Sequence, residues 1–158
     1  MRRTWSLAFD DGQGHTGLIE LSLPMHDAPA QSAGAGASCS FHATITVPDV
    51  GVVAVHDDDV PPPRVAGSLE IRAEGLWAEF LCETPGEPWS FGLEAFGLRF
   101  DTAEEAATAD VGDRIAVGYD LEWETALEGE TADRVIGDLL VGRTTIPLTA
   151  TGSFTTPP

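Results

Sequence analysis

The chain has 158 residues, 42% of them hydrophobic, and its charged residues give a net charge of 8 − 26 = −18. A chain of this length can bury a core as one domain without metal or disulfide staples, and we expect a single domain over residues 1–158. Its hydrophobic content excludes a disordered acidic tail. So acidic a surface repels nucleic-acid phosphate and anionic lipid, so we expect no nucleic-acid partner and no membrane partner.

The N-terminal residues lack the long apolar run that a secretory signal requires, and no segment reaches the roughly 18 consecutive apolar residues of a membrane span. We therefore expect a cytoplasmic protein. In that compartment Cys39 and Cys82 are expected to be reduced thiols and not a disulfide.

Alternating hydrophobicity predicts strands in the first third of the chain. Residues 4–10 and 15–23 place apolar side chains at odd positions with turn residues between the two runs, which predicts a hairpin. Residues 25–38 are mostly small or of types that interrupt helices and strands, and their hydrophobicity shows no periodicity. We therefore expect a flexible loop, which could be a lid or a plain linker. Residues 39–47 and 51–55 predict two further strands.

Residues 56–64, HDDDVPPPR, are expected to break the sheet. His56 and the aspartates at 57–59 could ligate a hard cation through oxygen. However, three adjacent carboxylates point in different directions and lack the ligand spacing of a calcium loop. We therefore expect a solvated turn and no metal site.

The next part of the chain is the most apolar. Residues 68–74 alternate, whereas residues 76–83 and 89–100 are apolar in both phases. A strand that has no solvent-exposed polar face is either covered by other elements on both sides, or it lines an apolar cavity with one face and contacts a partner protein with the other. Residues 101–110 predict the only helix, capped by Thr102 against the backbone of Glu105.

The clearest period lies in residues 111–127, where Val117, Tyr119, Leu121 and Trp123 alternate with mostly charged residues. Tyr119 and Trp123 need polar partners when buried, so they either bond to polar groups of the core or face a ligand cavity. Residues 133–141 and 144–151 predict the last strands, the second at an edge or bulge because of Pro147. Residues 153–158 are expected to fray.

About eight to ten strands and one short helix predict an all-β protein, and we favour an antiparallel barrel because closure removes exposed edges. Three segments, WSFGLEAFGLRFD, VGDRIAVGYDLEWE and VIGDLLVGRTTIPL, resemble the lipocalin-like proteins grouped with carotenoid hydratases and lipocalin-like Diels-Alderases. The resemblance covers about residues 65–146, roughly half of the chain, and such proteins generally have two barrel-like halves. It implies a lipocalin-like β-barrel with an apolar pocket for a polyene, terpenoid or polyketide-like molecule.

The sequence has no nucleophile elbow, P-loop, dinucleotide fingerprint or zinc spacing, so we expect no cofactor and no redox chemistry. Acid–base or purely positional catalysis in an apolar cavity remains. Glu94 is the first candidate, since a carboxyl buried among the phenylalanines and leucine at 96–100 would have a raised pKa and could act as a general acid. Glu79 is the second candidate. Either residue could instead be an outward carboxylate on an acidic surface.

Tyr119 could donate a hydrogen bond to a ligand carbonyl, or it could be a core tyrosine. Aromatic side chains could form flat walls for a conjugated ligand, although core packing would also explain them. These predicted substrate-binding residues are Trp77, Phe80, Trp89, Phe96, Phe100 and Trp123.

We therefore expect a cofactor-independent enzyme that binds an apolar substrate and promotes a cyclisation of the Diels-Alder type, an isomerisation or a hydration. Holding reacting groups in near-attack geometry can by itself lower the barrier by several kcal/mol. A carrier that binds a hydrophobic ligand without chemistry is an alternative. A structural module that forms a homodimer through its two-sided apolar strands is another.

Overall fold

The computed structural model describes residues 2–24, 38–65, 68–82, 84 and 88–158, and almost every element in them is a strand. This confirms the predicted all-β class, with one short helix in the described part of the chain. Of the predicted loop over 25–38, all but Ser38 lies outside the described residues. In chain order the elements are β1 Arg2–Asp10, β2 Thr16–Pro24, β3 Cys39–Val47, β4 Gly51–Val60, β5 Leu69–Ala73, β6 Leu76–Leu81, β7 Trp89–Phe100, α1 Ala103–Thr108, β8 Asp113–Glu124, β9 Arg134–Val141 and β10 Thr144–Thr155.

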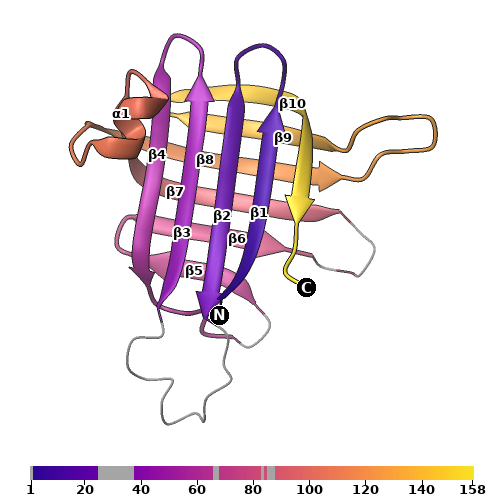
Figure 1. Ribbon diagram of the computed structural model, residues 1–158, viewed down its shortest axis with the longest axis horizontal. Helices are drawn as coiled ribbons and strands as arrows, with labels where there is room; N and C mark the ends of the chain where they lie inside the picture. The colour runs from indigo at the N-terminus through magenta and orange to yellow at the C-terminus, as the bar shows by residue number, and fades with distance from the viewer. Residues whose placement is uncertain (1, 25–37, 66–67, 83, 85–87) are drawn as a thin grey trace.

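Ten antiparallel strands form one sheet in the order β4-β3-β2-β1-β10-β9-β8-β7-β6-β5. Strand β4 also pairs with β7, so eight strands close into a hydrogen-bonded ring. The closure is short and joins residues 52–54 of β4 to residues 98–100 of β7. Figure 1 shows the two layers that result: β1–β4 lie side by side in front, β5–β9 cross behind them, and β10 bends from one layer to the other.

Strands β5 and β6 extend the sheet beyond the ring. One edge of β7 serves two neighbours, because residues 90–95 pair with β6 and only residues 98–100 pair with β4. The turn between β5 and β6 approaches β7 closely, and the Gly75 carbonyl accepts a hydrogen bond of 3.0 Å from the Phe96 amide. The outer face of β5–β9 is therefore a broad continuous surface.

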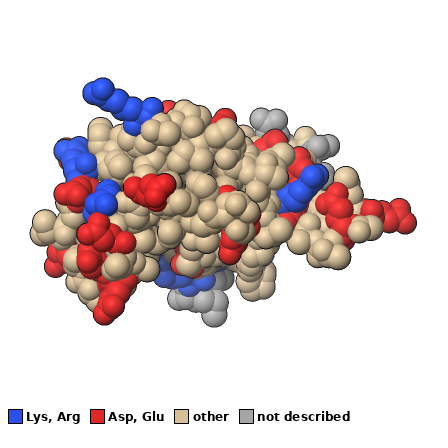
Figure 2. All heavy atoms as spheres, turned by 90° about the horizontal axis from the view of Figure 1, so that it is seen from above, with Lys and Arg blue, Asp and Glu red and all other residues tan. Residues whose placement is uncertain are grey.

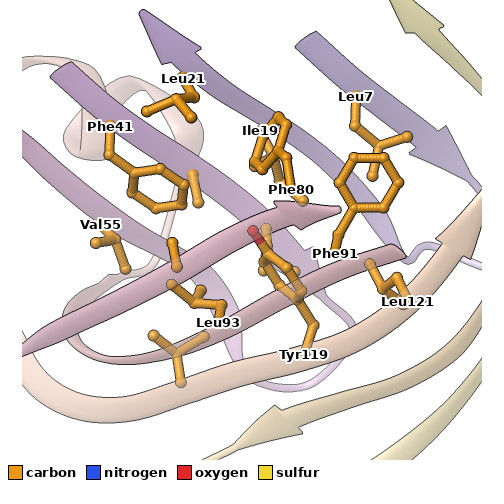
Figure 3. Packing of buried hydrophobic residues seen from close by; sticks show 14 of the residues in the cluster. Leu7, Ile19, Leu21, Phe41, Val55, Phe80, Phe91, Leu93, Tyr119 and Leu121 are labelled. Carbon is orange, nitrogen blue, oxygen red and sulfur yellow. The ribbon is translucent and has the colours of Figure 1, made fainter. Parts of the chain in front are cut away.

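Apolar side chains fill the interior of the ring. In β8, Val117, Tyr119 and Leu121 are buried, whereas Asp120 and Glu122, which point to the opposite face of the sheet, are exposed. This is the alternation that the sequence predicts. Figure 3 shows Tyr119 and Leu121 among the side chains of the facing strands. Burying one such side chain contributes roughly 1.5–3 kcal/mol. The buried side chains of the ring thus form one hydrophobic cluster.

Asp11 holds the turn between β1 and β2. Its carboxylate accepts hydrogen bonds from the backbone amides of Gln13 at 2.7 Å and His15 at 2.9 Å, and Nδ1 of His15 lies 2.7 Å from its second oxygen. Burial by itself raises the pKa of Asp11, but the backbone and His15 hydrogen bonds outweigh it and hold the pKa below its ordinary value. The turn therefore favours the ionised carboxylate.

Asp11→Ala is expected to lower the free energy of unfolding by about 1 kcal/mol near neutral pH, because two backbone donors lose their acceptor. A carboxyl whose pKa is lowered by folding contributes stability above its unfolded pKa and loses it as the pH falls through its folded pKa. The difference between the two proteins should therefore shrink as the pH drops below the ordinary value of 3.8. Urea unfolding of both proteins across this range checks the prediction, and a pH-independent difference contradicts it.

Two predicted irregular segments are strand instead. The predicted break at 56–64 is wrong for residues 56–60, since β4 continues to Val60 paired with β3, with one register irregularity between Cys39 and Phe41. The predicted fraying is wrong for residues 153–155, which pair with residues 6–8 of β1. The edge position predicted for Pro147 is confirmed: it pairs with β9, while the pairing of β10 with β1 begins only at Thr151.

The helix α1 is shorter than the predicted 101–110, but its cap is confirmed, because the Thr102 hydroxyl accepts from the Glu105 amide at 3.2 Å. Neither Cys39 nor Cys82 is part of a disulfide, and burial raises the pKa of the Cys39 thiol. No helix in the described residues has the length and apolar character needed to cross a membrane.

Acidic side chains gather at the two ends of the long axis. Figure 2 shows them over the α1 end on the left and over the β8–β9 connection on the right, with a largely uncharged surface between. Concentrated negative charge of this kind raises the local concentration of cations.

Candidate functional site

A groove of about 580 Å³ lies on the outer face of the sheet, over β5–β9. Small residues, Ala116 and Gly118, lie along its floor, and larger apolar side chains flank it. A single row of paired positions crosses it from strand to strand: Arg72, Trp77, Glu94, Gly118 and Leu140.

Glycines on the outer phase give the groove its depth. A Cβ on Gly118 would lie 2.6 Å from the Leu93 carbonyl oxygen, so a larger residue would not fit without a backbone shift. A Cβ on Gly92 would lie 2.7 Å from the indole of Trp77. The half-buried Trp77 ring therefore lies against the backbone of β7 and forms a flat wall.

Two exposed apolar side chains complete the walls. Phe96 is 55% exposed and Leu140 is 41% exposed. The guanidinium carbon of Arg114 lies 4.3 Å from the centroid of the Phe96 ring, a cation–π distance. Exposed apolar side chains that gather in a concave surface are typical of a binding site and not of scattered surface residues.

The charges around the groove are unevenly partnered. Arg72 donates a hydrogen bond of 3.0 Å to Glu70. This hydrogen bond, and to a smaller extent one from Trp77, lowers the pKa of Glu70. Glu94 is exposed, lines the groove and makes no ion pair within the described part of the chain. Its carboxylate can therefore meet a bound molecule.

Of the two alternatives predicted for Glu94, the outward carboxylate is confirmed. The carboxyl buried among residues 96–100 is wrong, because Glu94 and Phe96 are exposed on the outer face while Phe100 is buried. Tyr119 faces inward, so Glu94 and Tyr119 lie on opposite faces of the sheet and cannot contact one substrate together. Glu79 is half-buried on the outer face, paired across from Glu70, and does not line the groove.

Tyr119 carries a polar group into the core. It is 2% exposed, and its hydroxyl has no hydrogen-bond partner among the described residues. Figure 3 shows the hydroxyl oxygen pointing into the interior of the ring. Burial raises the pKa of Tyr119, so the phenol stays protonated.

The predicted substrate-binding aromatics separate into three places. Trp77 and Phe96 share the groove. Three others surround the Phe154 ring, with centroid distances of 6.2 Å from Phe80, 4.9 Å from Trp89 and 5.6 Å from Trp123. Phe100 lies near α1, against Gly112. The sequence does not indicate Phe154 as a core residue, because the prolines that follow it predict an irregular tail at the position where β10 in fact continues.

A second pocket of about 510 Å³ opens at one end of the ring. It contains the predicted residue Trp89, and it is also apolar on most of its walls. The other lining residues are Arg3, Trp5, Leu23, Pro24, Cys39, Pro62, Pro63, Val65, Ser68 and Leu69. Neither Tyr119 nor Trp123 lines this pocket or the groove.

One group of side chains on β3 and β4 could hold a metal ion. Nε2 of His42 lies 2.8 Å from one oxygen of Asp58, and Nε2 of His56 lies 2.7 Å from the other. The hydrogen bond from His42, and to a smaller extent the one from His56, lowers the pKa of Asp58. The sequence indicates only the local run at 56–59, because the pairing of His42 with His56 depends on the register of two strands.

No family model, curated protein or solved structure matches the chain. The resemblance to lipocalin-like proteins of the carotenoid hydratase and Diels-Alderase group therefore stays a prediction.

Proposed function

We propose that the protein binds an apolar small molecule in the outer groove, with Glu94 facing a hydrogen-bond donor or cationic group of that molecule. The observation that carries the proposal is the row of paired residues in which Glu94 lies between the Trp77 wall and the bare floor at Gly118. A volume of about 580 Å³ is in the range of small-molecule sites.

The composition of the groove favours a flat ligand. The Trp77 indole and the exposed Phe96 ring offer faces on which a planar or conjugated body can stack. A cation beside these rings gains from the ring quadrupoles as well as from the carboxylate of Glu94. The net charge of −18 raises the local concentration of such ligands further.

The test is calorimetric titration with naphthalene-type probes of matched size, a neutral one and 1-naphthylmethylamine. Ala116→Trp is expected to abolish binding of both, because it fills the groove from an exposed floor position. Thr44→Trp, an equally exposed strand position outside the groove, is the matched control and should bind both probes as the wild type does. Unchanged binding by Ala116→Trp would contradict the site.

Glu94→Gln separates the role of the charge from that of the apolar walls. It is expected to weaken binding of the amine by a few-fold, since an exposed ion pair contributes about 0.2–1 kcal/mol, and to leave the neutral probe unaffected. Equal effects on both probes would mean that Glu94 does not face the ligand.

The cofactor-independent cyclase or isomerase is a second proposal, and one observation favours it. The Tyr119 hydroxyl is a protonated donor without a partner in apolar surroundings, which is the kind of group that can polarise a carbonyl. The lipocalin-like barrel that the resemblance implies would place a substrate inside the ring. In that case the interior must open to admit a ligand, and removal of the hydroxyl must abolish turnover.

A further inference from the structure

Two histidines and an aspartate converge on the outer face of β3 and β4, and none of the three lines the groove. His42 and His56 are directly opposite each other in the pairing of the two strands, and Asp58 follows His56 on the same face. The imidazole centroids are 3.9 Å apart with an interplanar angle of 37°. Each ring directs Nε2 at a different oxygen of the same carboxylate.

We propose that His42, His56 and Asp58 bind a divalent transition-metal ion of the zinc class. Two imidazole nitrogens and one carboxylate oxygen are a donor set that such ions prefer, whereas magnesium and calcium prefer oxygen alone. One donor atom from each residue can be chosen so that all three lie within 4.8 Å of one another.

The observed geometry is close to that of a metal site. With bond lengths near 2.1 Å, neighbouring nitrogen and oxygen ligands are about 3.4 Å apart in a tetrahedral site and about 3.0 Å apart in an octahedral one. The nitrogen–oxygen distances of 2.7 and 2.8 Å are slightly shorter than both. With one donor atom from each residue the three atoms lie within 4.8 Å of one another, so an ion that replaces the two protons requires these exposed side chains to rearrange around it.

The backbone on both sides holds the three residues in place. The paired strands set the separation of the two histidines, and the Ser38 hydroxyl donates to the Asp58 carbonyl at 3.3 Å. The carboxylates of Asp57 and Asp59 add negative charge beside the site. Three protein ligands leave at least one coordination position for water, so the bound ion would be accessible from solvent.

The test is titration of the full chain with ZnCl₂ by calorimetry, together with the visible absorption of the Co²⁺ form. We expect one ion per chain. His42→Ala, His56→Ala and Asp58→Asn are each expected to lower the association constant at least tenfold, roughly the loss seen when even an outer-shell partner of a metal is removed. Circular dichroism of each variant checks that the fold is retained.

Asp59→Asn is the matched control, because it removes the same charge one residue away without removing a ligand. It is expected to change the association constant less than about twofold, since exposed charges are screened by salt. An equal loss of zinc affinity in Asp59→Asn and Asp58→Asn would overturn the proposal, because binding would then depend on the local negative charge and not on coordination by Asp58. Displacement of zinc by excess Mg²⁺ or Ca²⁺, or the absence of saturable binding, would also overturn it.

Discussion

Replacing Gly137 with alanine is expected to lower the free energy of unfolding by more than about 3 kcal/mol. Gly137 has a φ of +147°, which side-chain-bearing residues rarely adopt, and a Cβ built on it would lie 2.0 Å from the carbonyl oxygen of Asp120. It pairs with Leu121 of β8 and Leu148 of β10. A shift there disturbs three neighbouring strands of the ring.

Gly129 provides the matched control for this prediction. It also has a positive φ, of +89°, but a Cβ there would meet no atom within 4 Å. Gly129→Ala should therefore show only the conformational cost, about 1–2 kcal/mol. Urea unfolding of both variants separates the two contributions, and equal losses would mean that β8 and β9 do not approach each other as closely as the structure has them.

Replacing Tyr119 with phenylalanine is expected to raise the free energy of unfolding by about 1–3 kcal/mol. The buried hydroxyl has no hydrogen-bond partner among the described residues, so folding removes it from water without compensation, and its deletion removes that penalty. The ring itself stays in place because phenylalanine keeps its shape. Thermal and urea unfolding of the wild type and the variant measure the change.

Thr4→Val is the control with the opposite expected sign. The Thr4 hydroxyl lies 2.8 Å from that of Ser22 in a partly buried position, so its removal leaves a partner unpaired and should cost about 1 kcal/mol. If Tyr119→Phe also destabilises the protein, then the phenol bonds to a water molecule or ligand inside the ring. That outcome would favour the catalytic proposal, and stabilisation would favour a purely structural tyrosine.

These two experiments also bear on where a ligand can bind. A Tyr119 that behaves as a core residue leaves the outer groove as the better-supported site, since Glu94, Trp77 and Phe96 lie there and not inside. Together with the groove-filling and metal-binding variants, they separate the interior, the groove and the β3–β4 surface as sites of function.

The sequence by itself determined the elements whose signals are local. The alternation through Tyr119 predicted β8, Thr102 predicted the start of α1, and Pro147 predicted the part of β10 that lacks a second partner. Each of these depends on side-chain period, capping or the missing proline amide, which neighbouring residues decide among themselves.

Only the tertiary structure decided which face of the doubly apolar strands is inside. Phe91 and Leu93 are buried while Glu94 and Phe96 are exposed, although both phases of β7 are apolar in sequence. The meeting of His42 with His56 likewise required the register of β3 against β4. Strand period is a property of one segment, whereas face and register depend on how distant segments pair, so the groove and the histidine cluster could not be read from the chain alone.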